Sequence, residues 1–480
     1  MKKNIIKISV FLILLFLCLG YLTNLLERKY SANKLNGFFD EKENFDVLFF
    51  GTSHLINSVY PMQLYNDYGI ISYNMGNNSS NIPTTYWILK MALNYKKPKL
   101  VVIDCYSLSK NYKIARNDSL HNVMDGYPLS LTKIKAVQDL YKDPNLIEGG
   151  RNDSISKTEL FWNFVAFHSR WNELTKSDFI ADSSLLKGSD IVVKYRNSSK
   201  LFQSNTNSIL NKDGVAVEYL IKMIEECKKN DIEVLLTYFP MVPSEMDKME
   251  ANTAEVIAKE YNLKYLNFLD INLINSKYEY ADEGNHINVS GASNVTKYIG
   301  QYIMDNYDIK DRRSDNNYIH WKEDYNNYKI HKLSIYDRRK YLSDHILLMS
   351  GDNYNYIIEL LDDKLYKNKN NLQILELLGI NLKEISKNTD LIVISNDKVQ
   401  YYENFHRSNK IVESSLGKIK YIDSKDKYRI YFDNEKIYEI TNKQNNNISM
   451  RIGILEKESN EVLKTTKFYL DSGYGFLKKQ

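Results

Sequence analysis

The chain has 480 residues, of which 43% are hydrophobic and 26% are charged, and this composition is typical of globular domains. At roughly 100–200 residues per domain, the length predicts two to four domains. Basic residues number 64 and acidic residues 60, so the net charge of +4 excludes the strong basic field of a protein whose main partner is nucleic acid. The 3 cysteines exclude a disulfide framework and show no zinc-binding spacing, so we expect no metal site.

An apolar run follows the cationic amino terminus. Three lysines precede residues 8–26, which are long enough, at about 1.5 Å per helical residue, to cross a hydrocarbon core of about 30 Å. A cleaved signal peptide has a shorter apolar part and an A-x-A-like site, and none precedes Glu27. We therefore predict that residues 1–30 are a signal anchor. It would hold the chain in the cell membrane by a single span, with the soluble domains outside the cytoplasm.

Strands and helices alternate through residues 44–306. Short apolar runs predict strands at 46–50, 70–74, 100–104, 233–238 and 263–268. Apolar residues at helical spacing predict helices at 83–94, 214–230, 252–261 and 290–307. This alternation predicts an α/β domain with a parallel five-stranded sheet flanked by helices.

Two stretches depart from this alternation. Residues of about 107–212 are polar and irregular, apart from an aromatic cluster at 160–171. Insertions between a strand and a helix of an open sheet lie at its carboxyl edge, where ligands bind, so we interpret this stretch as a substrate-side cap. Residues 307–335 show little periodicity and are predicted to be a linker.

The candidate catalytic residues lie on two distant loops. Ser53 follows the first predicted strand in the sequence Phe-Gly-Thr-Ser-His, and a hydroxyl needs a base to become a good nucleophile. His286, before the last helix of the domain, is the candidate base. Because both loops reach the carboxyl edge of the sheet, we expect Ser53 and His286 to meet. Either Asp282 or Glu283 would orient the imidazole.

These motifs resemble those of the SGNH/GDSL hydrolases. Gly-Thr-Ser at 51–53 is similar to the family's first block, and Glu-Gly-Asn-His at 283–286 is similar to its last block. Gly76, after the second strand, matches the glycine that supplies an N–H group to the oxyanion hole. The resemblance implies a flavodoxin-like SGNH fold over residues 44–306.

The resemblance leaves the oxyanion hole incomplete. It implies donors from the N–H groups of Ser53 and Gly76, but the family's third-block asparagine has no clear match. Asn77 or Asn78 is the candidate replacement. One such donor contributes ~2.7–4 kcal/mol to transition-state stabilisation, so its absence is consistent with slow turnover or with transfer to a special acceptor.

The branch most resembled is membrane-anchored and extracytoplasmic, and it includes DltD-like proteins and polysaccharide O-acetylation proteins. It implies a Ser-His-acid esterase or O-acyltransferase, of acetyl or alanyl type, that uses no cofactor. Its substrate would be a cell-envelope glycan or teichoic-acid-like polymer, and a multi-pass membrane O-acyltransferase is a candidate partner. His168 and Arg170, in the aromatic cluster, are candidate ligands of the glycan or acyl carrier. The alternative is a catalytically degenerate SGNH domain that binds a glycan or serves as an acyltransferase scaffold.

Residues 336–480 are predicted to form a second, smaller α/β or α+β domain. We expect a strand at 346–349, a helix at 355–361, and two strands joined by a turn within 450–468. The region resembles the interleukin-like EMT inducer domain over about 340–471. This resemblance implies glycan binding or domain packing.

Overall fold

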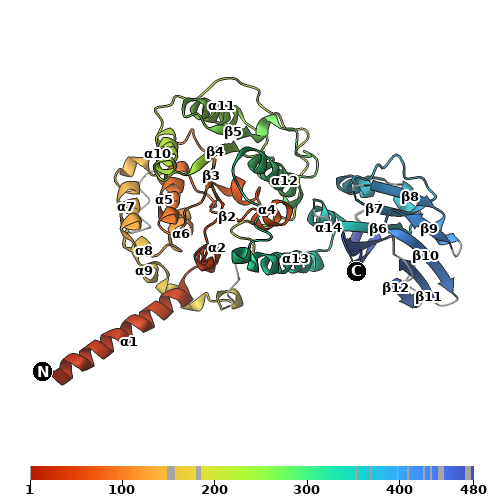
Figure 1. Cartoon of the computed structure of the whole chain (residues 1–480), viewed down its shortest axis with the longest axis horizontal. Helices are drawn as coiled ribbons and strands as arrows, with labels where there is room; N and C mark the ends of the chain where they lie inside the picture. The colour runs from red at the N-terminus through yellow and green to blue at the C-terminus, as the bar shows by residue number, and fades with distance from the viewer. Residues whose placement is uncertain are drawn as a thin grey trace. The chain divides into compact units, whose positions relative to one another are not determined.

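The computed structural model divides the chain into two compact units, Met1–His331 and Lys332–Gln480, which are treated separately here (Figure 1). It describes residues 2–479 except 116, 149–156, 180–184, 352–353, 368, 397, 408–409, 425–426, 433–434, 442–447 and 471–476.

The amino-terminal unit is built on a five-stranded parallel sheet. Its strands are β1 (Val47–Phe50), β2 (Ser72–Asn74), β3 (Leu100–Asp104), β4 (Glu233–Tyr238) and β5 (Lys264–Asn267). Their order is β2-β1-β3-β4-β5, and every neighbouring pair is parallel. All five predicted strands are thus confirmed to within two residues at either end. In a sheet of this order, ligands bind at the carboxyl ends of the strands where the order reverses, next to β1 and β3.

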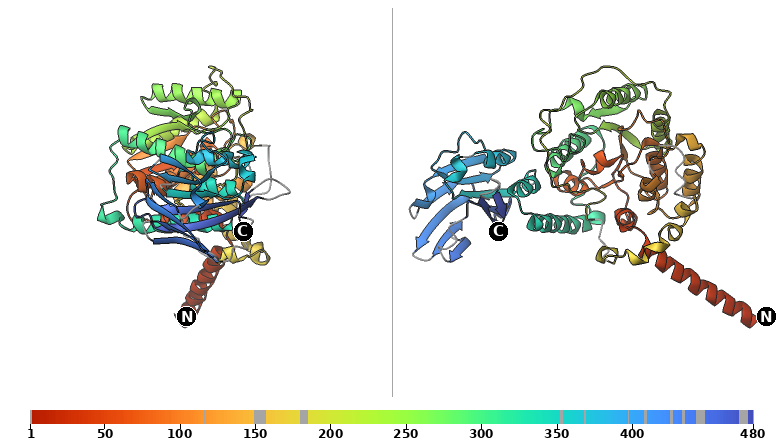
Figure 2. Two further views of the ribbon diagram at one scale, coloured as in Figure 1. Left: turned by 90° about the vertical axis from the view of Figure 1, so that its right-hand side faces the viewer. Right: turned by 180° about the vertical axis from the view of Figure 1, so that it is seen from behind.

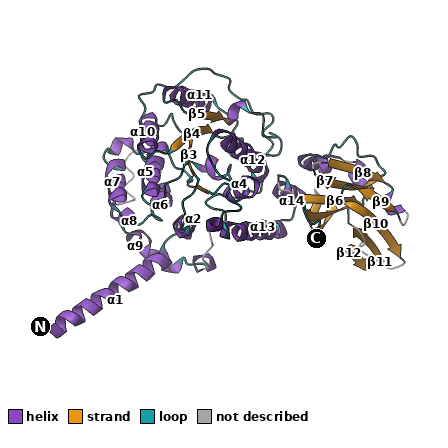
Figure 3. Cartoon of the chain, viewed as in Figure 1, coloured by secondary structure: helices purple, strands orange, loops and turns teal. Residues whose placement is uncertain are grey.

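Helices cover both faces of this sheet (Figures 1 and 3). The longer ones are α1 (Lys2–Leu26), α2 (Lys29–Asp40), α4 (Pro61–Tyr68), α5 (Ile82–Leu93), α6 (Asn117–Met124), α7 (Leu131–Leu140), α10 (Val215–Lys229), α11 (Glu245–Glu260), α12 (Val289–Asn306) and α13 (His320–Arg338). The short ones are α3 (Ser53–Ile56), α8 (Lys157–Phe161), α9 (Asn163–Phe167) and the 3-10 turns η1 (Pro144–Leu146), η2 (His168–Asn172), η3 (Lys176–Asp178), η4 (Phe268–Asp270) and η5 (Asn316–Tyr318). Contacts pair α5 with α10 on one side and α4 with α12 on the other.

The inserted stretch is more ordered than its sequence suggests. Its helices α6 and α7 pack against α5, in the helical layer of the domain, and α8 and α9 continue towards α1. Among its described residues, the long final part from about residue 189 to 212 contains no helix or strand. This final part contacts the loop of His286, as described below, and its role as a substrate-side cap stays a prediction.

The stretch predicted as a linker is mostly helical. Helix α13 has 19 residues and runs across the boundary between the two units. Its hydrophobic pattern is weak because only a few aromatic residues, including Trp321 and Tyr328, are buried. The indole of Trp321 donates a hydrogen bond of 2.8 Å to Glu41. This buried anchor orders a segment that composition alone marks as irregular.

The carboxy-terminal unit contains two antiparallel sheets, seen from two further directions in Figure 2. The six-stranded sheet has the order β15-β14-β13-β6-β7-β8, from β6 (Tyr354–Leu360), β7 (Thr389–Ser395), β8 (Lys398–Glu403), β13 (Met450–Glu456), β14 (Val462–Leu470) and β15 (Leu477–Lys479). The four-stranded sheet has the order β12-β11-β10-β9, from β9 (Ile411–Ser414), β10 (Gly417–Ser424), β11 (Lys427–Phe432) and β12 (Glu435–Thr441). Helical turns are α14 (Leu342–Met349), α15 (Lys364–Lys367), η6 (Lys369–Leu378) and η7 (Phe405–Arg407). One apolar core contains residues of both sheets.

Two predictions in this unit are wrong. The predicted strand at 346–349 is the buried end of helix α14, and the predicted helix at 355–361 is strand β6. Strand β6 lies between β7 and β13 and is buried along nearly its whole length. Both elements are short, and even polar residues such as Asn355 and Glu359 of β6 are buried. Neither therefore shows the period that separates a strand from a helix. The hairpin of β13 and β14 confirms the predicted strand, turn and strand.

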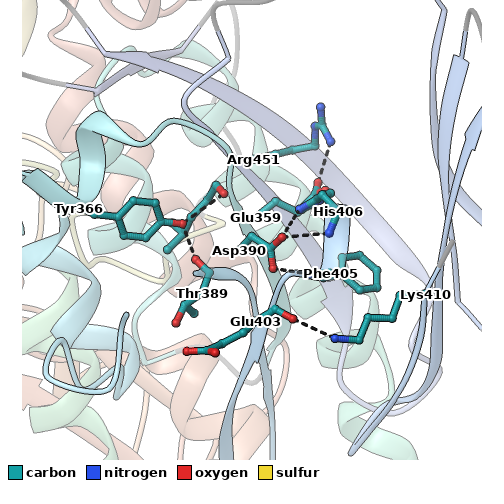
Figure 4. A network of polar contacts seen from close by, with 10 residues as sticks. Glu359, Tyr366, Thr389, Asp390, Glu403, Phe405, His406, Lys410 and Arg451 are labelled. Atoms are coloured by element: carbon teal, nitrogen blue, oxygen red, sulfur yellow. Dashed lines mark hydrogen bonds and ion pairs between the residues drawn. The ribbon is translucent and has the colours of Figure 1, made fainter. Parts of the chain in front are cut away.

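A buried ion network crosses the six-stranded sheet (Figure 4). The His406 ring nitrogens lie 2.7 Å from Glu359 Oε1 and 3.1 Å from Asp390 Oδ2, while Arg451 donates to Glu359 over 2.7 Å. Burial acts to lower the pKa of His406, but the hydrogen bonds to the two carboxylates outweigh it and raise the pKa to about 9. His406 is therefore an imidazolium at neutral pH and donates from both nitrogens.

Candidate active site

Ser53 stands where β1 turns into helix α3. Thr52 has an extended backbone and caps this short helix by accepting a hydrogen bond from the N–H of His54. Gly51 precedes it because the end of β3 lies so close: a Cβ atom on Gly51 would be 2.5 Å from the Cβ of Asp104. The glycine is therefore required by the close approach of two neighbouring strands, which holds the Ser53 loop against the sheet edge.

Asp104 ties this loop to β3. The Thr52 hydroxyl donates to Asp104 Oδ2 over 3.1 Å, and the N–H of Tyr106 donates to Oδ1 over 3.2 Å. Burial raises the pKa of Asp104 to about 7, although these hydrogen bonds act in the opposite direction. Thr52, at the place of the aspartate in Gly-Asp-Ser, thus positions the serine through a buried carboxyl group.

The structure brings Ser53, His286 and Asp282 into one hydrogen-bonded chain. Ser53 Oγ lies 2.9 Å from His286 Nε2, and His286 Nδ1 lies 2.6 Å from Asp282 Oδ2. Asp282 Oδ1 also accepts the main-chain N–H groups of Asn285 and His286, each over 2.9 Å. Burial acts to raise the pKa of Asp282, but the hydrogen bonds from His286 outweigh it and lower the pKa to about 2. An ionised Asp282 favours a proton on Nδ1, which leaves Nε2 free to accept the serine proton.

Of the two candidate acids, only Asp282 contacts the imidazole. The Glu283 carboxylate instead pairs with Arg196 over 2.8 Å, and its side chain is 66% exposed. Gly284 has a φ of +89°, and a Cβ there would lie 2.6 Å from Val242 Cγ2. This left-handed turn directs the two adjacent carboxylates to different partners. In the resembled family the acid stands three residues before the histidine, which is the position of Glu283, but in this structure Asp282 contacts the imidazole.

The loop of His286 is held by the extended end of the inserted stretch. The N–H of Arg196 donates to Tyr280 O over 2.8 Å, and the N–H of Val289 donates to Val192 O over 3.0 Å. The buried amide of Asn288 donates to the carbonyl oxygens of Lys194 and Tyr278. Its oxygen also accepts the N–H groups of Ser290 and Gly291, the second and third residues of α12. The loop is thus fixed on both sides before it presents the imidazole.

His54 is buried beside this chain and was not predicted as a site residue. Its ring centroid lies 4.9 Å from that of His286 and 4.1 Å from that of Tyr106. Burial and the neighbouring His286 lower the pKa of His54 to about 3, so it is neutral at physiological pH. Its position directly after Ser53 was the only signal in the sequence.

The predicted oxyanion donors differ in whether their N–H groups already have an acceptor within the protein. The N–H of Ser53 is the first of α3 and has no intrahelical acceptor. The N–H of Gly76, however, donates to Asn74 Oδ1 over 3.1 Å. Asn77 donates its N–H to Gly51 O and its side-chain amide to Met75 O. The half-buried Asn78 lies in the turn that follows. Gly76 and Asn77 are therefore engaged within the protein.

The proposed substrate ligands His168 and Arg170 lie at the end of α1. The Arg170 guanidinium donates to the carbonyl oxygens of Leu26 and Glu27 and pairs with Asp178 over 3.0 Å. The exposed His168 ring contacts Val165 O over 2.9 Å. Within the described part of the chain, the side chains of His168 and Arg170 thus contact α1 and their own segment, and not Ser53. No group of three or more metal-ligating side chains is found among the described residues.

No protein-family model matches the chain, and no curated protein matches its sequence. Among solved structures, it is similar to a Bacteroides fragilis protein described as an acylhydrolase (11% identity, 56% of this chain, 92% of the other, TM-score 0.28). It is also similar to a GDSL-like lipase of Bacteroides thetaiotaomicron (13%, 55%, 89%, 0.26). A third is a Desulfitobacterium hafniense protein described as lipolytic and of the G-D-S-L family (14%, 54%, 99%, 0.27). At these identities and scores, any functional conclusion rests on the geometry of Ser53, His286 and Asp282.

Proposed function

We propose that the chain is a membrane-anchored serine esterase or O-acyltransferase of the SGNH type. The observation that carries the proposal is the chain of contacts from Ser53 through His286 to Asp282, at 2.9 and 2.6 Å. An alcohol, an imidazole and an ionised carboxylate in this order form a nucleophile, its base and the group that orients the base.

The reaction follows from these positions. Ser53 Oγ attacks an ester carbonyl carbon as His286 Nε2 takes the hydroxyl proton. The resulting oxyanion lies near the N–H of Ser53, and its collapse expels the leaving alcohol, which takes the proton from His286. A water molecule or an acceptor hydroxyl then attacks the acyl-serine and regenerates Ser53. Attack by water gives hydrolysis, and attack by a sugar hydroxyl gives O-acyl transfer.

Helix α1 supports a location at the membrane. Residues Lys3–Leu26 are long and apolar enough to cross a bilayer, and no part of the most apolar window is buried in the protein. With this helix as an anchor, we propose that the catalytic unit lies outside the cytoplasm and acts on a cell-envelope polysaccharide. The acyl group would be acetyl or alanyl, and a multi-pass membrane O-acyltransferase would be the candidate partner.

The test is active-site labelling of the full-length chain in detergent. A fluorophosphonate probe should label the wild-type protein and not Ser53→Ala, and the wild type should hydrolyse an activated acetyl ester. Labelling that persists in Ser53→Ala would show that another group reacts. Absence of both labelling and hydrolysis in a folded wild-type protein would refute the enzymatic proposal.

A second candidate is a non-catalytic SGNH domain that binds a glycan or an acyltransferase. It is favoured by the N–H of Gly76, which donates to Asn74 instead of facing the serine. The two candidates differ in the same assay. A binding protein would retain a glycan without labelling at Ser53.

A further inference from the structure

The side chains of α1 become less exposed over its last two turns. Large apolar side chains along its first part are open, including Phe11 at 63% and Phe16 at 71%. Leu26, at the last turn, is only 5% exposed. The distance along the helix from Lys7 to Leu26 is about 28 Å at ~1.5 Å per residue, close to the thickness of a hydrocarbon core. Leu26 therefore marks the level at which a spanning α1 would leave the bilayer.

Two side chains of residues 157–179, Asn163 and Arg170, attach this segment to the end of α1, and Asp178 braces one of them. The Asn163 amide donates to Glu27 Oε2 over 3.3 Å. Arg170 donates to the carbonyl oxygens of Leu26 and Glu27, and Asp178 holds the same guanidinium over 3.0 Å. Figures 1 and 2 show this segment beside the junction of α1 with the domain.

The two tethering residues and Asp178, which braces Arg170, each have an exposed aromatic neighbour in the sequence. Trp162 precedes Asn163, Trp171 follows Arg170, and Phe179 follows Asp178. Their exposed fractions are 44%, 71% and 66%, respectively. Three large aromatic side chains left open on one short segment are unusual for a surface in contact only with water. Tryptophan in particular favours the boundary between lipid tails and headgroups.

We propose that Trp162, Trp171 and Phe179 form an aromatic collar that inserts into the lipid headgroup region where α1 leaves the membrane. This proposal rests on the anchoring by α1 that forms part of the proposed function. A lipid surface is favoured over a glycan because the collar is continuous with the span. In addition, the guanidinium of Arg170 is already held by two carbonyl oxygens and Asp178. Arg170 is a positioning residue for the collar and not a substrate ligand.

The collar gives the catalytic unit a second attachment. A single helix holds a domain near a bilayer but leaves it free to tilt. Aromatic side chains in the interface on the side of α1 restrict this tilt, because each would have to leave the headgroup region. The Ser53 site would then keep one height and orientation above the membrane, which suits a substrate or acyl donor presented there.

The test uses the full-length chain in liposomes that contain phospholipids brominated on the upper part of the acyl chain. The chain has 4 tryptophans, none of them in α1, and the other two, Trp87 and Trp321, are 8% and 0% exposed. Bromine quenches tryptophan only at short range. We expect the wild type to lose roughly a third of its emission, because two of the four emitters would lie at the interface. The double variant W162F/W171F should lose almost none.

A matched pair of variants locates the contact. In the W162F/W171F background, Phe179→Trp should restore quenching. Phe202→Trp should not restore quenching, although Phe202 is 87% exposed, because it lies beside the loop of His286. The side chain of the preceding residue, Leu201, lies 3.2 Å from a Cβ placed on Gly284 of that loop. Equal quenching of the two variants, or an unquenched wild type that resists alkaline carbonate extraction, would overturn the collar. Release of the wild type by carbonate would instead overturn the anchoring itself, and the collar with it.

Discussion

Replacing Asp282 with asparagine tests the arrangement of the site most directly. The carboxylate lies 2.6 Å from His286 Nδ1 and has a pKa lowered from 3.8 to about 2. A shift of almost two units corresponds to ~2.5 kcal/mol, which we reduce to about 1 kcal/mol because the side chain is one-third exposed and screened by water. Loss of the charge alone should therefore slow the reaction about fivefold.

The change of tautomer adds to this loss. An asparagine amide can donate to Nδ1, which moves the ring proton to Nε2, where it blocks acceptance of the Ser53 proton. In serine proteases the corresponding change costs about 10⁴-fold in kcat. We expect Asp282→Asn to lower the rate of ester hydrolysis and of fluorophosphonate labelling by about 10²- to 10⁴-fold, with the melting temperature almost unchanged.

Glu283→Gln is the matched control on the neighbouring residue. Its carboxylate pairs with Arg196 at the surface, so we expect less than about a twofold change in the labelling rate. The reasoning would be refuted if Asp282→Asn kept more than half of the wild-type rate. It would also be refuted if Glu283→Gln were the more damaging change of the two.

Three further predictions concern buried polar groups. Asn74→Ala removes three hydrogen bonds to the main chain, so it should lower the free energy of unfolding by about 2–4 kcal/mol in a denaturant titration and also reduce labelling. Asp104 has a raised pKa of about 7, so between about pH 4 and 7 the folded protein binds a proton that the unfolded chain does not, and stability falls as the pH rises through this range. Asp104→Asn should flatten the dependence of melting temperature on pH in this range, and an unchanged slope would contradict the assignment. His406 has a raised pKa of about 9, so its protonated form stabilises the fold fully below about pH 6.5, and this stabilisation is lost as the pH rises through 9. It contributes at most ~3 kcal/mol to the free energy of unfolding, and a denaturant titration of His406→Gln should show no such alkaline loss.

The amino-terminal fold was predictable because its elements have unambiguous patterns. The strands β1 and β3 are apolar along their length and lie between helices whose amphipathic stripes are evident, as in α10. The pairing of Ser53 with His286 followed from the rule that both loops end at one sheet edge. Both predictions use only the pattern of residues along the chain and general rules of parallel-sheet topology, so they could be made from the sequence.

Some contacts of the site are decided by tertiary structure, and the sequence left them open. The choice of Asp282 over Glu283 depends on the left-handed turn at Gly284, and spacing along the chain does not determine it. The N–H of Gly76 donates to Asn74, and no motif in the sequence singles out that asparagine. An arginine in an aromatic cluster is typical of a ligand-binding site. Arg170 instead donates to the carbonyl oxygens at the end of α1, and no pattern in the sequence predicts this contact.

The pinning of the His286 loop by residues 192–196 has a consequence for biosynthesis. Ser53 emerges from the ribosome 233 residues before the imidazole it needs, and the segment that holds the imidazole loop is made in between. The nascent chain therefore carries an unactivated alcohol until the inserted stretch has docked and the last helix of the domain has closed over it. Under the proposed function, the Ser53 hydroxyl would become reactive only once the domain has folded.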